Sequence, residues 1–169
     1  MGAGRPPTSG NKEWEMKRIL LLLWLCALPA CAQEHIDKLL LLMQKRLALA
    51  PTVAQVKWNN HLPIDDPVRE EQILEKAPEA QRAFLRAQFE ASKTIQQQCR
   101  QNWVSQHTST FPTAPSLAEI RVQLDQVTGD MLQALEAARP ELEQPELLQK
   151  ALGKYPESDA WNRALEPLR

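Results

Sequence analysis

Apolar residues recur at alternating intervals of three and four along most of the chain, the spacing that places side chains on one face of a helix. In residues 35–50 this stripe is continuous, and it resumes after Pro51 and runs to Trp58. Asp66 followed by Pro67 predicts the start of another helix, since aspartate caps free amides and proline fits the first turn. Further helices are predicted at residues 79–104, 116–138, 144–152 and 157–166. No segment alternates with the period of two that marks a strand, so we expect an all-α, single-domain helical bundle with one continuous core.

The first 32 residues depart from this pattern and predict an export signal. Residues 16–18 are Met-Lys-Arg, residues 19–28 are apolar, and residues 29–32 are Pro-Ala-Cys-Ala. A basic start, a short apolar segment and a small-residue end are typical of a cleavable secretory signal, and the apolar segment is too short to span a bilayer. We therefore expect residues 1–32 to be an N-terminal extension and signal peptide, with Met16 as the natural start.

Removal of the signal leaves residues 33–169 as a periplasmic or secreted domain, in which residues 139–169 form a C-terminal helical extension. Lipoprotein processing at Cys31 is less favoured, because a proline beside the small residue is atypical of such sites. Cys99 is then the one remaining cysteine, so the mature chain has no internal disulfide and its stability must come from packing. Because Cys99 falls on the apolar face of its helix, we expect a buried, inert thiol.

The composition narrows the possible function classes. The 169 residues include only 5 glycines, of which Gly129 and Gly153 alone lie beyond residue 32, so the chain lacks material for a glycine-rich nucleotide-binding loop. With 20 Lys+Arg against 21 Asp+Glu the chain shows no basic stripe, and we expect no nucleic-acid partner. The histidines lie far apart, without metal-ligand spacing, and we expect neither a metal nor a cofactor to bind at His35, His61 or His107.

The unusual feature that remains is the position of cations and amides on the helices. Arg46 and Lys57 are eleven residues apart, which on a helix is three turns and nearly one face, and both adjoin apolar positions. Other polar residues lie beside an apolar stripe or just after a helix start: Asp66, Arg69, Glu70, Ser92, Gln96 and Arg121. Each one taken alone is compatible with solvent exposure at a helix flank. Together they would line a pocket with four buried cations (Arg46, Lys57, Arg69 and Arg121), which suits a small dicarboxylate whose reaction needs orientation and electrostatic stabilisation.

At these residues the chain resembles a known family. The spacing from Arg46 through Lys57 to Asp66-x-x-Arg69-Glu70, followed by Ser92-x-x-x-Gln96, is similar to the AroQ class of chorismate mutases, and most similar to its secreted gamma subclass. The similarity covers about residues 36–135 and is densest in residues 43–74. In the gamma subclass one chain supplies the whole site, and Arg121 matches the arginine that there replaces one from a partner chain. A monomer and a homodimer are both compatible with this arrangement.

The resemblance implies that the protein binds chorismate, a small-molecule substrate, and converts it to prephenate by a Claisen rearrangement without a cofactor. Arg46 and Arg121 would bind the two carboxylates of chorismate, with help from Ser92. Asp66 and Arg69 would shape and charge the site. The substrate would thus be held by charges on helix faces, and no stable membrane span is implied.

The resemblance also assigns the chemical step to particular residues. Glu70 would accept a hydrogen bond from the ring hydroxyl, while Lys57 and Gln96 would donate to the ether oxygen as the C–O bond breaks. Lys57, Gln96 and Arg46 are the implied catalytic residues. Some gamma members carry a C-terminal disulfide that Cys99 alone cannot form. Some family members have a glutamate at the position of Gln96, and a glutamate must be protonated to donate a hydrogen bond. Because Gln96 donates without titrating, we expect activity to persist from mildly acidic to mildly alkaline pH.

The residues by themselves leave two other functions open. One is a non-enzymatic, exported helical adaptor or chaperone, in which the cations are surface residues. The other is a related pericyclic or lyase reaction on isochorismate. Consumption of chorismate by purified protein lacking residues 1–32 distinguishes the first, and analysis of the product distinguishes the second.

Overall fold

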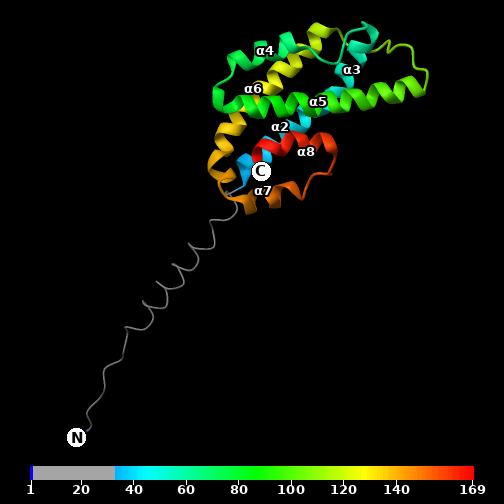
Figure 1. Cartoon of the computed structure of the whole chain (residues 1–169). Coiled ribbons are helices and arrows are strands. Elements are labelled where there is room, and N and C mark those ends of the chain that lie inside the picture. Colours follow the sequence, from blue (N-terminus) through cyan, green and yellow to red (C-terminus); the bar gives the residue numbers. More distant parts are fainter. Residues whose placement is uncertain (2–32) are drawn as a thin grey trace. The chain divides into compact units, whose positions relative to one another are not determined.

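The computed structural model describes Met1 and residues 33–169, and residues 34–169 form one compact helical unit (Figure 1). In this unit the order of elements is α2 (Glu34–Ala48), α3 (Ala50–Asn59), α4 (Pro67–Lys76), α5 (Glu79–Ser105), α6 (Leu117–Leu142), α7 (Pro145–Leu152), α8 (Asp159–Leu165) and the 3-10 helix η1 (Glu166–Leu168). The described residues contain no strand. The prediction of an all-α, single-domain fold is confirmed.

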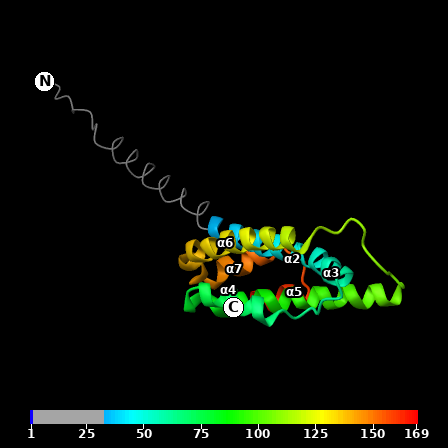
Figure 2. The ribbon, with the colours of Figure 1, turned by 90° about the horizontal axis from the view of Figure 1, so that it is seen from above.

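The long helices pack in pairs around the core. Helix α2 lies along α6, and α5 packs against α8 and α3. Figure 2 shows α2 and α6 side by side, with α5 running along the opposite side of the unit and α4 next to it. Polar residues on the inner faces of α2, α5 and α6 are therefore directed toward the same interior space.

Local sequence explains where the helices near the cavity begin. Pro51 lies in the first turn of α3, where its missing N–H costs nothing, so α3 follows α2 with one residue between them. Asp66 caps α4 by accepting a hydrogen bond from the backbone N–H of Arg69 at 3.3 Å, as its sequence predicts. Helix α6 begins with a capping box, in which Ser116 and Glu119 bond each other's backbone N–H groups.

One predicted helix end is wrong by several residues. Helix α6 continues past residue 138 to Leu142 and contains Pro140, which falls in its last turn. There a proline removes one intrahelical hydrogen bond without stopping the helix. Helix α8 ends at Leu165, one residue before its predicted end, and residues 166–168 tighten into the 3-10 helix. The remaining predicted helices agree with the structure to within a few residues.

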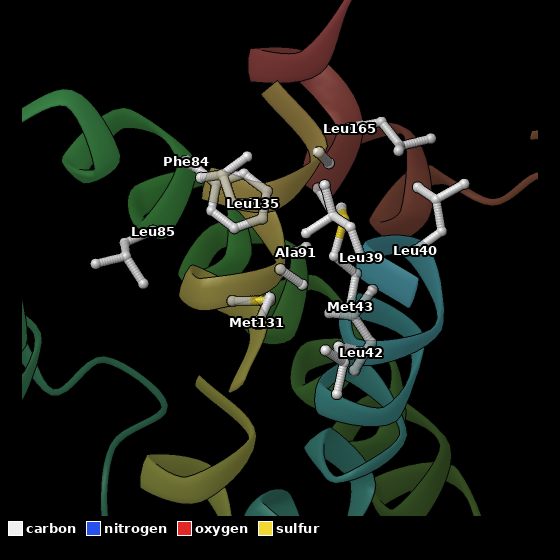
Figure 3. Close-up of a cluster of buried hydrophobic side chains, with 14 of the residues drawn as sticks. Leu39, Leu40, Leu42, Met43, Phe84, Leu85, Ala91, Met131, Leu135 and Leu165 are labelled. Carbon is white, nitrogen blue, oxygen red and sulfur yellow. The ribbon is translucent and has the colours of Figure 1, made fainter. Parts of the chain in front are cut away.

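The apolar interior consists of two clusters of buried side chains, so the expectation of one continuous core is wrong. The larger cluster joins α2, α5, α6, α7 and α8, and it includes Leu39, Met43, Phe84, Met131 and Leu165 (Figure 3). The smaller cluster consists of Val53, Val56 and Ile120, from α3 and α6. Polar residues on the inner helix faces interrupt the packing between the two clusters, as described below.

The chain after residue 142 is part of the packing of the larger cluster. Leu148 on α7 and Trp161 on α8 are buried in it. The amide of Gln88 on α5 donates to the carbonyl oxygen of Ala164 on α8 at 2.8 Å. At the start of the unit, the buried carboxylate of Glu141 on α6 accepts hydrogen bonds from the first turn of α2. These hydrogen bonds connect α8 to α5 and the start of α2 to α6.

The loop between α5 and α6 is attached to the end of α3. The side chain of Asn59 forms two hydrogen bonds of 2.9 Å with the backbone of Phe111, and Trp58 donates to the Ser109 carbonyl oxygen at 3.0 Å. The ring of Trp103 packs against the rings of Trp58 and Phe111. This aromatic cluster fixes the far ends of α3 and α5 relative to each other.

Two expectations from the sequence concern segments outside the cavity. The predicted signal in residues 1–32 lies outside the described residues, and no helix of the described chain is long and apolar enough to cross a membrane.

Cys99 is half-buried, so the expectation of a buried thiol is wrong. The buried face of α5 includes Gln88 and Gln96 but not Cys99. Partial burial still raises the pKa of the Cys99 thiol, which disfavours the reactive thiolate.

Candidate active site

A cavity opens between α2, α3, α4, α5 and α6. The empty space inside it and in its open mouth amounts to about 720 Å³, and its lining includes residues from both apolar clusters. All the polar residues selected from the sequence line this one cavity: Arg46, Lys57, Asp66, Arg69, Glu70, Ser92, Gln96 and Arg121. The fold thus brings together side chains from five helices at the place where the apolar core is interrupted.

Arg46, on the last turn of α2, is the most deeply buried cation of the cavity, with 5% of the residue exposed. Its Nε donates to Thr128 Oγ1 at 3.2 Å, its Nη1 donates to the Gln88 carbonyl oxygen at 3.1 Å, and its Cζ lies 5.3 Å from the ring centroid of Phe89. Among residues 33–169, no carboxylate forms an ion pair with it. Burial lowers the pKa of Arg46 to about 10, with the charge of Glu70 acting in the opposite direction. At neutral pH the residue is therefore a buried cation that no carboxylate of residues 33–169 contacts directly.

Lys57, on α3, is the second buried cation, with 8% of the residue exposed. Since α3 follows α2 with one residue between them, the helical repeat carries Lys57 to the same side of the unit as Arg46. The Lys57 ammonium donates to the carbonyl oxygen of Ile64, in the loop that leads into α4. Burial lowers the pKa of Lys57, and the negative charges of Asp66 and Glu70 act against this effect. The ammonium keeps further N–H groups for a ligand in the cavity.

The other two cations lie nearer the solvent, each in an ion pair that bridges α4 and α6. Arg69 Nη2 lies 2.6 Å from each carboxylate oxygen of Asp125, and Arg121 Nη2 donates to Asp66 Oδ2 at 3.0 Å. Their side chains are 27% and 42% exposed, for Arg69 and Arg121 respectively. The expectation of four buried cations is therefore wrong for these two. The cavity combines two buried cations inside with two paired cations at its open side.

Ser92 and Gln96 lie one turn apart on α5 and bond to each other. Gln96 is 4% exposed, and its Nε2 donates to Ser92 Oγ at 3.1 Å. Gln96 Oε1 is buried and has no hydrogen-bond partner among the described residues. A rotation of the amide by half a turn lets the Ser92 hydroxyl donate to Oε1 and leaves Nε2 free to donate to a ligand. The buried amide thus has hydrogen-bonding capacity that the protein itself does not use.

Lys93, which the sequence analysis missed, lies beside Glu70 in the cavity wall. Its ammonium is 2.6 Å from Glu90 Oε1, 3.3 Å from Glu70 Oε2 and 3.5 Å from Asp65 Oδ1. Burial by itself lowers the pKa of Lys93, but the hydrogen bonds with Glu90 and Glu70 outweigh it and raise the pKa. Lys93 therefore stays protonated and holds the carboxylate of Glu70 against α5.

Two further lining residues were missed because their partners are distant in the sequence. Thr128 bonds Arg46 from α6, and Asp125 bonds Arg69 from the same helix. One signal was present, since Thr128 follows Val127 and is a polar residue beside an apolar stripe. Nothing in the sequence pairs Asp125 with α4, because that contact depends on how α4 packs.

The arrangement is suited to a small ligand with two negative charges. Arginine forks bind carboxylates with two parallel hydrogen bonds, and lysine supplies a compact charge. In residues 33–169 no group of three or more histidine, cysteine, aspartate or glutamate side chains is placed to hold a metal ion. The chemistry that the described residues can provide is orientation and electrostatic stabilisation in a cavity between five helices.

Comparisons with known proteins agree with this geometry. Residues 34–97 match the family model for chorismate mutase type II. The crystal structure of the chorismate mutase from Burkholderia thailandensis is similar with a TM-score of 0.71 and 30% sequence identity, covering 80% of this chain and 99% of that chain. This chain belongs to the type II (AroQ) chorismate mutase family. The family predicted from the spacing of Arg46, Lys57 and Asp66 is confirmed.

Two curated relatives belong to the same group of proteins. A monofunctional chorismate mutase of Enterobacter agglomerans is 32% identical over 103 residues, which cover 55% of this chain and 56% of the relative. A secreted chorismate mutase of Yersinia pestis is 29% identical over 104 residues, which cover 56% of this chain and 55% of the relative. The matched part of the chain spans about half the length of these curated relatives.

Most of the cavity lies in the segment that carries the chorismate mutase match. Seven of the predicted site residues fall within residues 34–97: Arg46, Lys57, Asp66, Arg69, Glu70, Ser92 and Gln96. Arg121 lies outside this segment, on α6, and reaches the cavity through the packing of α6 on α2 and α3. The candidate site of this chorismate mutase family member therefore combines the matched segment with a helix from later in the chain.

Proposed function

We propose that the protein is a chorismate mutase, an isomerase that converts chorismate to prephenate within a single molecule and without a cofactor. The observation that carries the proposal is the buried guanidinium of Arg46, which forms no ion pair with a carboxylate of residues 33–169 and shares its cavity with Lys57 and Gln96. A buried cation without a partner costs folding free energy, so its presence favours a function that needs a bound anion. Chorismate carries two carboxylates, and membership of the family indicates this substrate.

The two carboxylates of chorismate would be bound at opposite sides of the cavity. Arg46 binds one of them with its free Nη2 edge, and Ser92 assists with its hydroxyl. Arg121 binds the other, exchanging its contact with Asp66 for the substrate. Arg69 supplies a further positive charge at the open side. Binding in this way selects the compact substrate conformation in which the two reacting carbons approach each other.

The chemical step breaks the ether C–O bond while a C–C bond forms, with no atom gained or lost. Negative charge develops on the ether oxygen, and Lys57 and Gln96 donate hydrogen bonds to it. Glu70, held by Lys93 at 3.3 Å, accepts the hydrogen bond of the ring hydroxyl. A rate enhancement of about 10⁶ corresponds to roughly 8 kcal/mol, which two donors in a desolvated cavity, together with conformational selection, can supply.

The test is the consumption of chorismate by purified protein, followed by its ultraviolet absorbance. We expect turnover by the wild type and losses of at least a hundredfold in kcat/KM for Arg46→Ala and for Lys57→Ala. Lys45→Ala is the matched control, because Lys45 is an exposed residue next to Arg46. A wild type without turnover contradicts the proposed function and favours the exported adaptor or chaperone. Active Arg46→Ala and Lys57→Ala variants contradict the site while leaving the function.

Product analysis separates this proposal from a reaction on isochorismate. We expect prephenate as the product from chorismate and no accelerated loss of pyruvate from isochorismate. Faster turnover of isochorismate than of chorismate would assign the cavity to the related reaction instead.

We further infer that the protein belongs to the exported gamma subclass. The support is the signal-like pattern of residues 1–32, the similarity to a secreted chorismate mutase, and a cavity that brings together all eight predicted site residues within this chain. In this proposal residues 33–169 are the mature periplasmic or secreted domain, and residues 139–169 are a helical extension that supports α5. N-terminal sequencing of exported protein tests the cleavage after Ala32. Activity of a dilute monomer tests whether one chain suffices, whether or not the protein also forms a homodimer.

A further inference from the structure

Thr128 is a buried polar residue that occupies an inner position of α6. It is 9% exposed, it lines the cavity, and its Oγ1 accepts the hydrogen bond from Arg46 Nε at 3.2 Å. The neighbouring inner positions of α6 are apolar, with Leu124 one turn before and Met131 nearly one turn after. Neither the apolar packing nor the capping of α6 requires a hydroxyl at residue 128.

The hydrogen bond fixes how the guanidinium of Arg46 faces the cavity. Thr128 holds Nε and the Gln88 carbonyl oxygen holds Nη1, so two of the three guanidinium nitrogens are bonded to protein atoms from α6 and α5. Nη2 donates no hydrogen bond to the described residues, and it is not among the buried polar atoms without a partner. Its N–H groups therefore face the open space of the cavity, where a carboxylate would bind.

We propose that Thr128 is a positioning residue, which orients the Arg46 guanidinium so that Nη2 meets a carboxylate of the bound substrate. The inference rests on the proposed function, because that function supplies the carboxylate. A long arginine side chain has several rotamers, and ordering it before binding removes an entropic cost from the complex. The Phe89 ring, 5.3 Å from Arg46 Cζ, limits the motion of the guanidinium on a further side.

The test compares three substitutions at two threonines. Thr128→Val keeps the branched shape but removes the hydroxyl, and we expect KM for chorismate to rise about tenfold, because a buried charged donor loses its acceptor. Thr128→Ser keeps the hydroxyl, and we expect KM within about twofold of the wild type. Thr94→Val is the control: its hydroxyl bonds the Glu90 carbonyl oxygen of its own helix, and we expect no change in KM. Circular dichroism in urea verifies that each variant is folded.

A double-mutant cycle separates positioning from a general effect on the fold. In an Arg46→Met background no donor is left for Thr128 to accept from, so Thr128→Val should then change kcat/KM by less than about twofold. Equal losses in both backgrounds, or an unchanged KM for Thr128→Val, would overturn the inference. If the wild type does not convert chorismate, the proposed function fails as well. An active wild type with an unimpaired Thr128→Val variant rejects the positioning role alone.

Discussion

Replacing Arg46 by methionine should make the protein more stable and inactive. Arg46 is buried without a carboxylate partner in the described chain, and a methionine has a similar unbranched shape with no charge to desolvate. A residue that serves only the fold gives the opposite result, since its removal destabilises. The stability of the Arg46→Met variant therefore shows directly whether this cation is kept for binding.

The expected magnitude follows from the pKa of Arg46. Burial lowers this pKa from its ordinary value to about 10, and at roughly 1.4 kcal/mol per unit the charged form is disfavoured in the folded state by about 3 kcal/mol. Because the folded-state pKa lies below the unfolded one, the whole cost is present at neutral pH. The substitution also removes the hydrogen bonds to Thr128 and to the Gln88 carbonyl oxygen, each contributing about 1 kcal/mol. We expect a net stabilisation of about 1 kcal/mol.

The measurement is urea unfolding of the wild type and the variant, followed by far-ultraviolet circular dichroism at neutral pH. Lys45→Met is the matched control, because it places the same side chain on the neighbouring exposed position and should change neither stability nor activity. Chorismate turnover is measured on the same samples, and Arg46→Met should lose at least a hundredfold in kcat/KM. An Arg46→Met variant that unfolds at a lower urea concentration than the wild type would refute the reasoning, because Arg46 would then be a net contributor to the fold.

Three further predictions concern pH and capping. Glu141→Ala should lower the free energy of unfolding by about 2 to 3 kcal/mol at neutral pH, because the backbone N–H groups of His35 and Ile36 lose their charged acceptor. Burial raises the pKa of Glu141, but the hydrogen bonds from Ile36 and His35 outweigh this effect and hold the pKa below 4.5. The stabilisation by Glu141 should therefore disappear as the pH falls through the folded-state pKa. A difference in stability from the wild type that persists in acid contradicts this prediction. Burial lowers the pKa of Lys57, so kcat of the wild type should decline at a lower alkaline pH than an ordinary lysine would give. Lys57→Arg should abolish that decline while retaining reduced activity. The same alkaline decline in the wild type and in Lys57→Arg assigns the decline to another group. Wild-type kcat should stay level between about pH 6 and about pH 8, because Gln96 donates without titrating, whereas Gln96→Glu should lose activity as the pH rises; a steep loss in the wild type rules out this role for the amide.

Much of the helical framework was predictable from local features of the sequence. The apolar stripe of residues 35–50, the proline that begins α3 and the aspartate that caps α4 act over a few residues, and the structure contains all three. The placement of Arg46 and Lys57 on one side also follows from the helical repeat, because α2 and α3 are nearly continuous.

Which polar side chains are buried was decided by tertiary packing. Arg46 and Arg121 both lie beside apolar stripes, yet the first is enclosed and the second is 42% exposed, because α4 approaches α6 with a carboxylate that holds Arg121 at the cavity mouth. Cys99 follows the predicted stripe and is still only half-buried. The direction of a side chain on its helix does not determine how much of the facing space another helix fills.

The sequence by itself thus determined the helices, the family and the set of polar residues around one cavity. Tertiary structure alone decided that the core is divided into two clusters, that two of the four cations are paired at the surface, and that Thr128 and Lys93 complete the cavity wall. The physical reason is the separation of the interacting residues along the sequence. Helix formation and capping depend on neighbours within a few residues, whereas burial and ion pairing depend on contacts between segments far apart along the chain. For Arg46 and Thr128, the separation bridged by one hydrogen bond is 82 residues.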